Sequence, residues 1–168
     1  MRTDYLLRQE LKCVLAALTP PNQLVIEVML RTGLRVSDVL RLRTSALEAR
    51  MWITEGKTRK RRQIGLGEAL KARLEAQAGE VWVFEGRKDP AKHRTRQAVW
   101  HDVKRAAKAF RIPANIGTHS VRKTYAVEMM ERYGDIERVR RALNHDRMET
   151  TVIYALADHL VKKRGRGR

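Results

Sequence analysis

The chain has 168 residues, a length that favours one domain large enough to bury a core without disulfides or metals. Lys and Arg number 36 against 19 Asp and Glu, which gives a formal net charge of +17. The single cysteine, Cys13, excludes an internal disulfide and a CxxC-type zinc site. Charges interrupt every apolar run well before the roughly 18 residues of a membrane span, and the N-terminus has no secretory signal. We therefore expect a cytoplasmic protein that does not enter the membrane.

The large positive charge favours a polyanionic partner, because Lys and Arg that neutralise phosphates release condensed counterions. A membrane-surface helix would concentrate its basic residues opposite an apolar face, and the sequence shows no such segment. Aromatic residues make up only 5% of the chain, which argues against a stacking platform for single strands. Charge thus predicts binding to DNA or RNA, but it predicts no reaction.

Apolar periodicity and helix-ending residues predict mostly helices, over 6–18, 22–31, 37–42, 68–78, 95–110, 119–133, 135–143 and 147–157. Ser37 is a suitable N-cap for the third of these. The pattern changes at 51–54 and 63–66, which flank a basic turn and predict a β-hairpin. Residues 81–84 are a short strand or a buried connector. The expected fold class is mainly α with a small antiparallel β-sheet (α+β).

Two segments in the first half contain basic residues that could take part in a reaction. Arg35 follows Thr32-Gly33-Leu34 and opens a helix, where Asp38, three residues on, is close enough to orient its guanidinium. Lys57 lies in the hairpin turn, from which a lysine can reach into a groove and donate a proton. The same turn holds further candidates for phosphate contacts: Arg59, Lys60, Arg61 and Arg62. Such a charged turn also discourages sheet pairing, so a purely structural role is equally compatible with the sequence.

Two segments in the second half add histidines and a tyrosine. His119 and Arg122 are three residues apart at a helix start, so both can face one phosphate. His145 stands at a helix junction, and Tyr154 follows nine residues later in an amphipathic helix. Taken one at a time, these residues fit ordinary surface or packing roles.

In this order the four segments resemble the catalytic domain of the tyrosine recombinases, the phage integrase family. That family has an Arg after a TGLR turn, a Lys on a β-hairpin, His-x-x-Arg, a His in LGH and a nucleophilic Tyr nine residues beyond it. The matching residues are Arg35, Lys57, His119, Arg122, His145 and Tyr154. Asp38, by its spacing from Arg35, is expected to support this site. The resemblance implies a cytoplasmic, nucleoid-associated protein of a prokaryote, phage or mobile element.

The sequence departs from the family pattern at a few positions. Asn144 replaces the Gly of LGH, and Asn is a common substitute at a left-handed helix end, so we expect the geometry to survive. Lys123 and Leu156 replace frequent family histidines, and Lys60 rivals Lys57 as the catalytic lysine. We expect a catalytic domain over 1–161 and a basic tail over 162–168. The family's N-terminal core-binding domain has no counterpart in the sequence, so the chain is a minimal enzyme or a fragment.

The resemblance implies a site-specific recombinase that cleaves and rejoins DNA through a 3′-phosphotyrosyl intermediate. Two arginines would clamp the nonbridging oxygens, so no metal or other cofactor is expected, and no carboxylate cluster is present to hold Mg²⁺. Tyr154 would be the nucleophile, His119 and His145 phosphate ligands or bases, and Lys57 the acid for the leaving 5′ oxygen. The alternatives are a type IB topoisomerase-like enzyme and a non-cleaving DNA-binding regulator.

The expected partner is double-stranded DNA, on which the family assembles as a tetramer, whereas the free protein is expected to be a monomer. An apolar C-terminal segment around 155–161 could dock on a neighbouring protomer or pack on its own domain.

Overall fold

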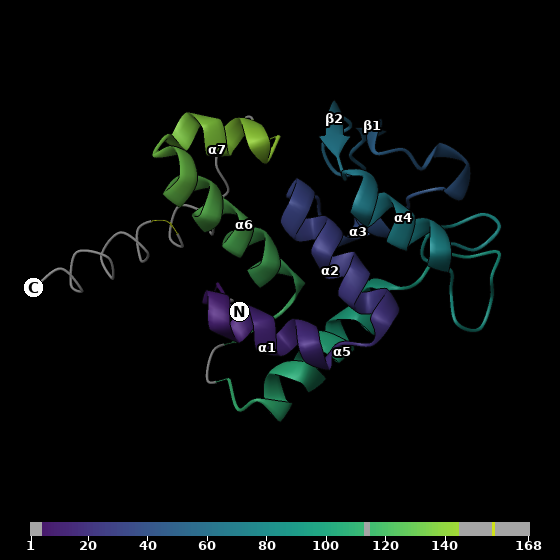
Figure 1. Ribbon diagram of the computed structural model, residues 1–168, viewed down its shortest axis with the longest axis horizontal. Coiled ribbons are helices and arrows are strands. Elements are labelled where there is room, and N and C mark those ends of the chain that lie inside the picture. The colour runs from purple at the N-terminus through teal and green to yellow at the C-terminus, as the bar shows by residue number, and fades with distance from the viewer. Residues whose placement is uncertain (1–4, 113–114, 145–155, 157–168) are drawn as a thin grey trace, which may run out of the picture.

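The computed structural model describes residues 5–112, 115–144 and 156 and consists of helices with one two-stranded antiparallel sheet (Figure 1). The helices are α1 (Arg8–Ala17), α2 (Pro20–Thr32), α3 (Val36–Leu40), α4 (Glu68–Gln77), α5 (Arg96–Ala109), α6 (Thr118–Tyr133) and α7 (Ile136–Ala142), with a 3-10 turn η1 (Thr44–Ala46). The strands are β1 (Arg50–Thr54) and β2 (Arg61–Gly65). The expected fold class, mainly α with a small antiparallel β-sheet, is confirmed.

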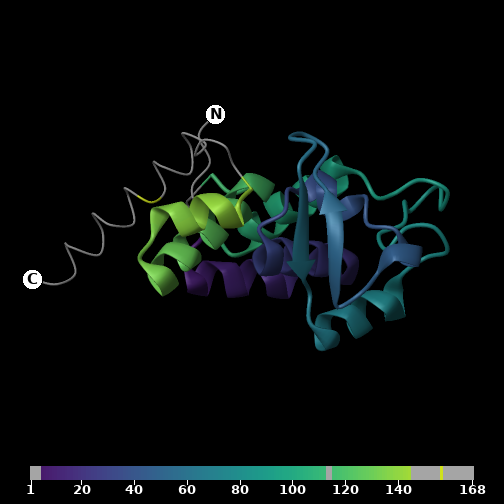
Figure 2. The same ribbon diagram turned by 90° about the horizontal axis from the view of Figure 1, so that it is seen from above.

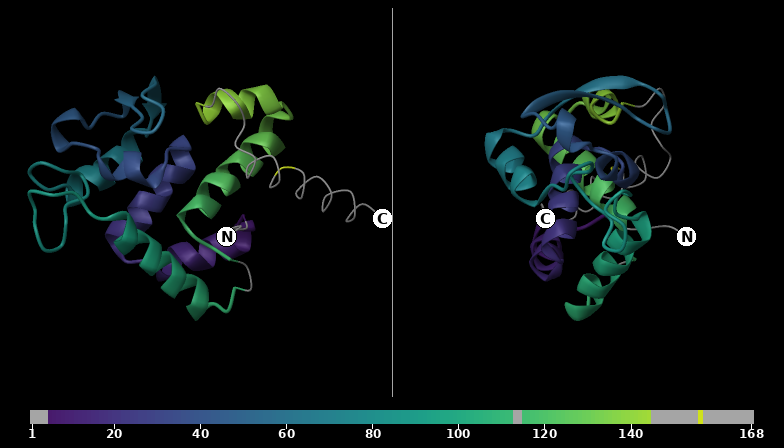
Figure 3. Two further views of the ribbon diagram at one scale, coloured as in Figure 1. Left: turned by 180° about the vertical axis from the view of Figure 1, so that it is seen from behind. Right: turned by 90° about the vertical axis from the view of Figure 1, so that its right-hand side faces the viewer.

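Helix α2 lies at the centre of the molecule, with α6 and α7 on one side and the sheet and α4 on the other (Figure 1); the view from behind shows the same order (Figure 3). Pro20 and Pro21 begin α2, where a missing backbone N–H costs nothing because no helical acceptor exists there. Val25, Ile26 and Val28 are completely buried, so α2 contacts neighbours on several faces. The central helix therefore fixes where both flanking parts of the molecule stand.

Two glycines end the helices that matter most for the arrangement. Gly33 follows α2 with φ 67°, and Gly134 follows α6 with φ 66°, the left-handed conformation that glycine adopts without steric cost. Side-chain caps start two other helices: Thr95 Oγ1 accepts from Ala98 N at 3.1 Å, and Asp135 Oδ1 accepts from Glu137 N at 2.8 Å. These signals explain why the observed helix ends lie close to the expected ones.

The hairpin stands on one flank of the helices, and Figure 2 shows its two strands side by side. The register runs from Arg50 opposite Gly65 to Thr54 opposite Arg61. Glu55 N donates to Lys60 O at 3.0 Å and Arg59 N donates to Glu55 O at 2.9 Å, so the turn is closed by its own backbone. Arg59 has φ 58°, an uncommon conformation for a residue with a side chain.

One local expectation is wrong. Ser37 is not the cap of α3, because the extended residue before the helix is Arg35 and Ser37 already lies inside it. Of the two alternatives for residues 81–84, the structure shows the buried connector: Trp82 makes a single bridge to Arg43, and Val83 and Phe84 are buried. The helix expected over 147–157 lies outside the described residues except for Leu156, which is helical and buried.

Buried apolar side chains form two separate clusters. The larger one runs through α1, α2, α3, the sheet, α4 and α5, and it includes Ile26, Leu40 and Phe84. The smaller one joins the middle of α6 to α7 and consists of Tyr5, Ala126, Val127, Val139, Leu143 and Leu156. Helix α6 contributes to both, because its Val121 belongs to the larger cluster. Across the described residues, no helix is both long enough and apolar enough to cross a membrane.

Candidate active site

Three arginines from three different elements meet at the C-terminal end of α2. Arg35 comes from the start of α3, Arg62 from β2 and Arg122 from the first turns of α6. Arg62 and Arg122 donate to the carbonyls of Thr32 and Gly33, and Arg35 follows two residues later. The fold therefore brings together Arg35 and Arg122, which are 87 residues apart in the sequence.

A completely buried carboxylate, Glu55, lies between two of these arginines. Its Oε2 accepts a hydrogen bond from Nη1 of Arg35 at 2.7 Å, and both side chains are almost fully enclosed. Its Oε1 lies 3.1 Å from Nε of Arg62 as an ion pair, without the angle of a hydrogen bond. Thr58 Oγ1 donates to the same carboxylate at 3.3 Å. A buried charge is tolerated only when it is paired, and here two cations pair it.

Arg62 and Arg122 make parallel connections between α2 and α7. Arg62 donates through Nη2 to Thr32 O at 2.9 Å and through Nη1 to Ala142 O. Arg122, which is 3% exposed, donates to Gly33 O and, at 2.9 Å, to Leu143 O. Carbonyls at the end of a helix carry partial negative charge and lack helical donors, so guanidiniums are favourable partners for them. The two side chains thereby hold the end of α7 against the end of α2.

Burial shifts the pKa of two groups in this region. Desolvation lowers the pKa of the Arg62 guanidinium, and the nearby Glu55 partly offsets it. Desolvation also raises the pKa of the Tyr125 hydroxyl, while Arg62 and Arg122 act in the opposite direction. The ring of Tyr125 packs against Gly33, where an added Cβ would come within 2.8 Å of its Cδ1. A side chain at position 33 would therefore separate α2 from α6.

Asp38 supports the hairpin and not Arg35. Its Oδ1 accepts from Nη2 of Arg41 at 2.6 Å and from the backbone N–H of Gly56 at 2.9 Å. The expectation that Asp38 orients Arg35 is thus not what its contacts show, because Glu55, 20 residues away in sequence, occupies that place. Asp38 instead fixes the residue that precedes Lys57.

The other hairpin residues divide between solvent and interior. Lys57, Arg59 and Arg61 are exposed and Lys60 is half-buried. The Arg61 guanidinium stacks 5.0 Å from the ring centre of the exposed Trp52. Arg62 was expected to contact DNA but turns inward, and the sequence holds the signal for this: it lies two residues before the buried Ile64, on the same face of β2. The sequence offers no reason to select Glu55, because its distance of 20 residues from Arg35 does not indicate that the two side chains pair.

The remaining candidates are placed in part. His119 is exposed in the first turn of α6, one turn before the buried Arg122, so the two share one side of that helix. Asn144 follows α7 with φ 56°, which confirms the left-handed conformation expected there. His145 and Tyr154 lie outside the described residues.

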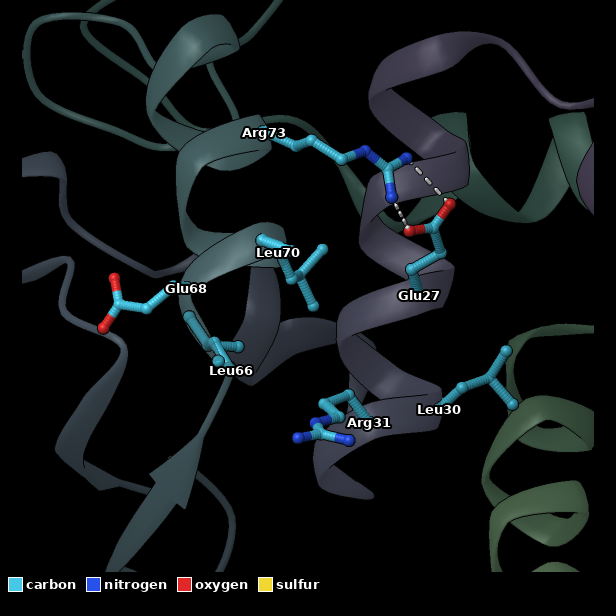
Figure 4. A pocket seen from close by; sticks show the side chains of 9 residues that line it. Glu27, Leu30, Arg31, Leu66, Glu68, Leu70 and Arg73 are labelled. Carbon is cyan, nitrogen blue, oxygen red and sulfur yellow. Dashed lines mark hydrogen bonds and ion pairs between the residues drawn. The ribbon is translucent and has the colours of Figure 1, made fainter.

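No three His, Cys, Asp or Glu side chains gather into a possible metal site within the described ranges. A hollow of about 590 Å³ lies between α2 and α4, where Arg73 forms an ion pair with Glu27 across its mouth (Figure 4). Leu30, Leu66 and Leu70 supply its apolar lining. It shares no residue with the arginine cluster. What distinguishes the candidate site is the convergence of three nearly enclosed guanidiniums with a single carboxylate among them, an excess of positive charge that suits an anion.

Comparison with known proteins gives one consistent result. Residues 5–160 match the family model described as "Phage integrase family". The integrase of Escherichia phage P2 is 30% identical over 154 residues, which cover 91% of this chain and 43% of that protein. The tyrosine recombinase XerD of Oceanobacillus iheyensis is 28% identical over 155 residues, covering 85% of this chain and 51% of XerD. The chain thus spans about half the length of these relatives.

Solved structures share the fold. The XerA recombinase superposes with a TM-score of 0.76 at 20% identity, over 98% of this chain and 63% of that one. A lambda integrase tetramer bound to a Holliday junction gives a TM-score of 0.75 at 18% identity, over 95% of this chain and 49% of that one.

Proposed function

The chain belongs to the phage integrase family, and from this we propose that it is a site-specific DNA recombinase, which cleaves and rejoins DNA through a 3′-phosphotyrosyl link to Tyr154. The observation that supports the proposal best is the group of three guanidiniums, from Arg35, Arg62 and Arg122, at the C-terminal end of α2. One buried carboxylate, Glu55, offsets only part of that charge. The excess positive charge suits a phosphodiester.

Arg35 and Arg122 are the residues we assign to the scissile phosphate. When an oxygen attacks phosphorus, negative charge grows on the nonbridging oxygens, and fixed cationic donors stabilise that charge without having to reorganise. A guanidinium can bind two such oxygens at once and keeps its charge throughout. Both side chains are held before DNA arrives, by Glu55 in one case and by backbone carbonyls in the other.

The proton movements are assigned to the remaining candidates. The Tyr154 oxygen forms a bond to phosphorus as it loses its proton, and the bond from phosphorus to the 5′ oxygen breaks. His119 and His145 are the candidates to accept or share the first proton, and Lys57 donates a proton to the leaving 5′ oxygen. Attack by a 5′ hydroxyl of another strand reverses these steps and rejoins the DNA.

The exposed cations of the hairpin, Lys57, Arg59 and Arg61, would contact the backbone of double-stranded DNA. The lambda integrase neighbour was solved as a tetramer on a Holliday junction. We infer the same mode for this chain: a monomer in solution that assembles as a tetramer on DNA. Its place would be the cytoplasm, on the nucleoid of a prokaryote or on phage or mobile-element DNA.

A nicked half-site tests the proposal, with the DNA taken from the sequence that flanks the gene. Cleavage next to the nick releases a short oligonucleotide, so religation fails and the covalent complex accumulates on a denaturing gel. Tyr154→Phe removes one oxygen, and we expect it to abolish the adduct while DNA affinity changes by no more than a few fold, because phosphate contacts supply affinity. An adduct formed by the Phe variant would refute the assignment of the nucleophile.

A further inference from the structure

A continuous set of contacts runs from Arg35 to the end of α7. Nη1 of Arg35 lies 2.7 Å from Oε2 of Glu55, and Oε1 of Glu55 lies 3.1 Å from Nε of Arg62. Arg62 then donates to Thr32 O at 2.9 Å and to Ala142 O. Four elements, α2, α3, β2 and α7, thereby meet at two side chains that the proposed chemistry does not use.

The placement of Arg62 leaves its guanidinium committed to protein groups. Nε faces Glu55, Nη1 faces Ala142 O and Nη2 faces Thr32 O, and only 13% of the side chain is exposed. The neighbouring Arg61 is exposed on the opposite face of β2 and is available to DNA. Arg62 therefore has the contacts of a connecting residue, whereas Arg61 has those of a phosphate contact.

The link reaches the residues that the proposed reaction needs. Glu55 lies two residues before Lys57, on the same hairpin. Ala142 lies two residues before Asn144, whose left-handed backbone turns the chain just ahead of His145. A shift of Arg62 would therefore displace the end of α7 relative to Arg35, and misplacement by about 1 Å can cost about a hundredfold in rate.

We propose that Glu55 and Arg62 are positioning residues, which hold Arg35, the hairpin and the end of α7 in one fixed arrangement. The inference rests on the proposed recombinase function, since that function makes the arrangement matter. Neither residue touches the phosphate. Both act by fixing the groups that do.

Arg62→Lys and Arg62→Gln test the proposal, with Arg73→Gln as the matched control. Lys retains the charge, but its three N–H donors lie on one nitrogen, so it cannot span the two carbonyls and the Glu55 carboxylate as the wide guanidinium of Arg62 does. The control breaks the Arg73–Glu27 ion pair between α4 and α2 (Figure 4), which shares no residue with the contacts of Arg62. We expect both Arg62 variants to bind DNA with unchanged affinity and salt dependence, and to cleave about a hundredfold more slowly at saturating DNA in single turnover. Arg73→Gln should match the unmodified protein in both measurements.

Amide hydrogen exchange provides a readout that does not depend on cleavage. The Leu143 and Asn144 amides donate to Val139 O and Arg141 O in the last turn of α7. Loss of the Arg62 bond to Ala142 O should speed their exchange about tenfold or more, whereas amides inside α2 should keep their rates. Glu55→Gln, which keeps the shape of the side chain, should give the same pattern because it removes the charge that holds Arg62.

Several outcomes would overturn the proposal. One such outcome is that Arg62→Gln weakens DNA binding and lowers by about 1 the slope of the logarithm of the binding constant against the logarithm of salt concentration. If cleavage and amide exchange are unchanged at the same time, Arg62 is a phosphate contact. If α2 and α7 amides exchange faster by the same factor, or the variants do not fold, the role is general stability and not positioning. If the unmodified chain forms no covalent adduct, the recombinase function fails, while the exchange measurement still decides whether Arg62 holds α7.

Discussion

Gly33→Ala is the substitution for which the structure predicts the clearest effect. The residue has φ 67°, and an added Cβ would press on the ring of Tyr125, with Cδ1 at 2.8 Å. The left-handed backbone costs a residue with a side chain about 1–2 kcal/mol. The ring belongs to α6 and cannot swing aside like the tip of a lysine, so overpacking adds about 1–3 kcal/mol. We expect a total loss of about 2–5 kcal/mol in the free energy of unfolding.

Gly134→Ala separates the cost of the left-handed backbone from the cost of overpacking. Gly134 has nearly the same φ, 66°, but an added Cβ would meet nothing within 4 Å. It should therefore lose only the backbone term, about 1–2 kcal/mol. Urea denaturation of both variants, with the slopes checked for equality, gives the difference directly.

Cleavage should separate the two variants further. Gly33 O accepts from Arg122, and Arg35 follows two residues later, so a displaced Gly33 would misplace both proposed phosphate ligands. We expect slow single-turnover cleavage by Gly33→Ala under conditions where it is folded, and ordinary cleavage by Gly134→Ala. Equal stability losses in the two variants would refute the argument from the Tyr125 contact.

Three further predictions concern protons and charge. Lys57→Ala should cleave normal DNA slowly but recover on a strand whose 5′ bridging oxygen is sulfur, because a thiolate leaves without a proton; recovery by Lys60→Ala instead would move the acid to Lys60. Cleavage should persist in excess EDTA, and its loss on chelation with recovery on adding Mg²⁺ would contradict the roles given to the arginines. Burial raises the pKa of Asp102, but hydrogen bonds from Asn22, Thr19 and Arg105 outweigh it and hold the pKa at about 2. Its carboxylate should therefore stabilise the fold by about 2 kcal/mol above pH 4, and this stabilisation should disappear as the pH falls from 4 to 2. In Asp102→Asn, the free energy of unfolding should depend less on pH over that range, which acid denaturation measures.

The local parts of the fold could be predicted from the sequence because local residues determine them. Gly33 and Gly134 end their helices, alternation at 51–54 and 63–66 defines the hairpin, and Asn144 takes the left-handed conformation expected of it. One local signal was misleading: Ser37 is a suitable N-cap residue, yet the extended backbone of Arg35 begins α3 and Ser37 lies inside the helix.

The partners within the site could not be predicted, because tertiary packing decides them. A spacing of three residues favours Asp38 as the partner of Arg35, yet the fold places Glu55 beside that guanidinium and gives Asp38 to Arg41 and the hairpin. Arg62 sits in a run of basic residues that looks uniform, and only the face it shares with Ile64 separates it from Arg61. The residue types indicate the kind of chemistry, and the three-dimensional contacts decide which residues are placed to carry it out.

The division of the apolar interior into two clusters has a consequence for how the molecule opens. Helix α7 is attached by the smaller cluster and by the carbonyl bonds of Arg62 and Arg122, whereas α2 is enclosed on several sides. Detaching α7 exposes far less apolar surface than unfolding α2, so it requires less free energy. The segment with His145 and Tyr154 thus follows the less firmly attached helix, and we expect the amides of α7 to exchange faster than those inside α2.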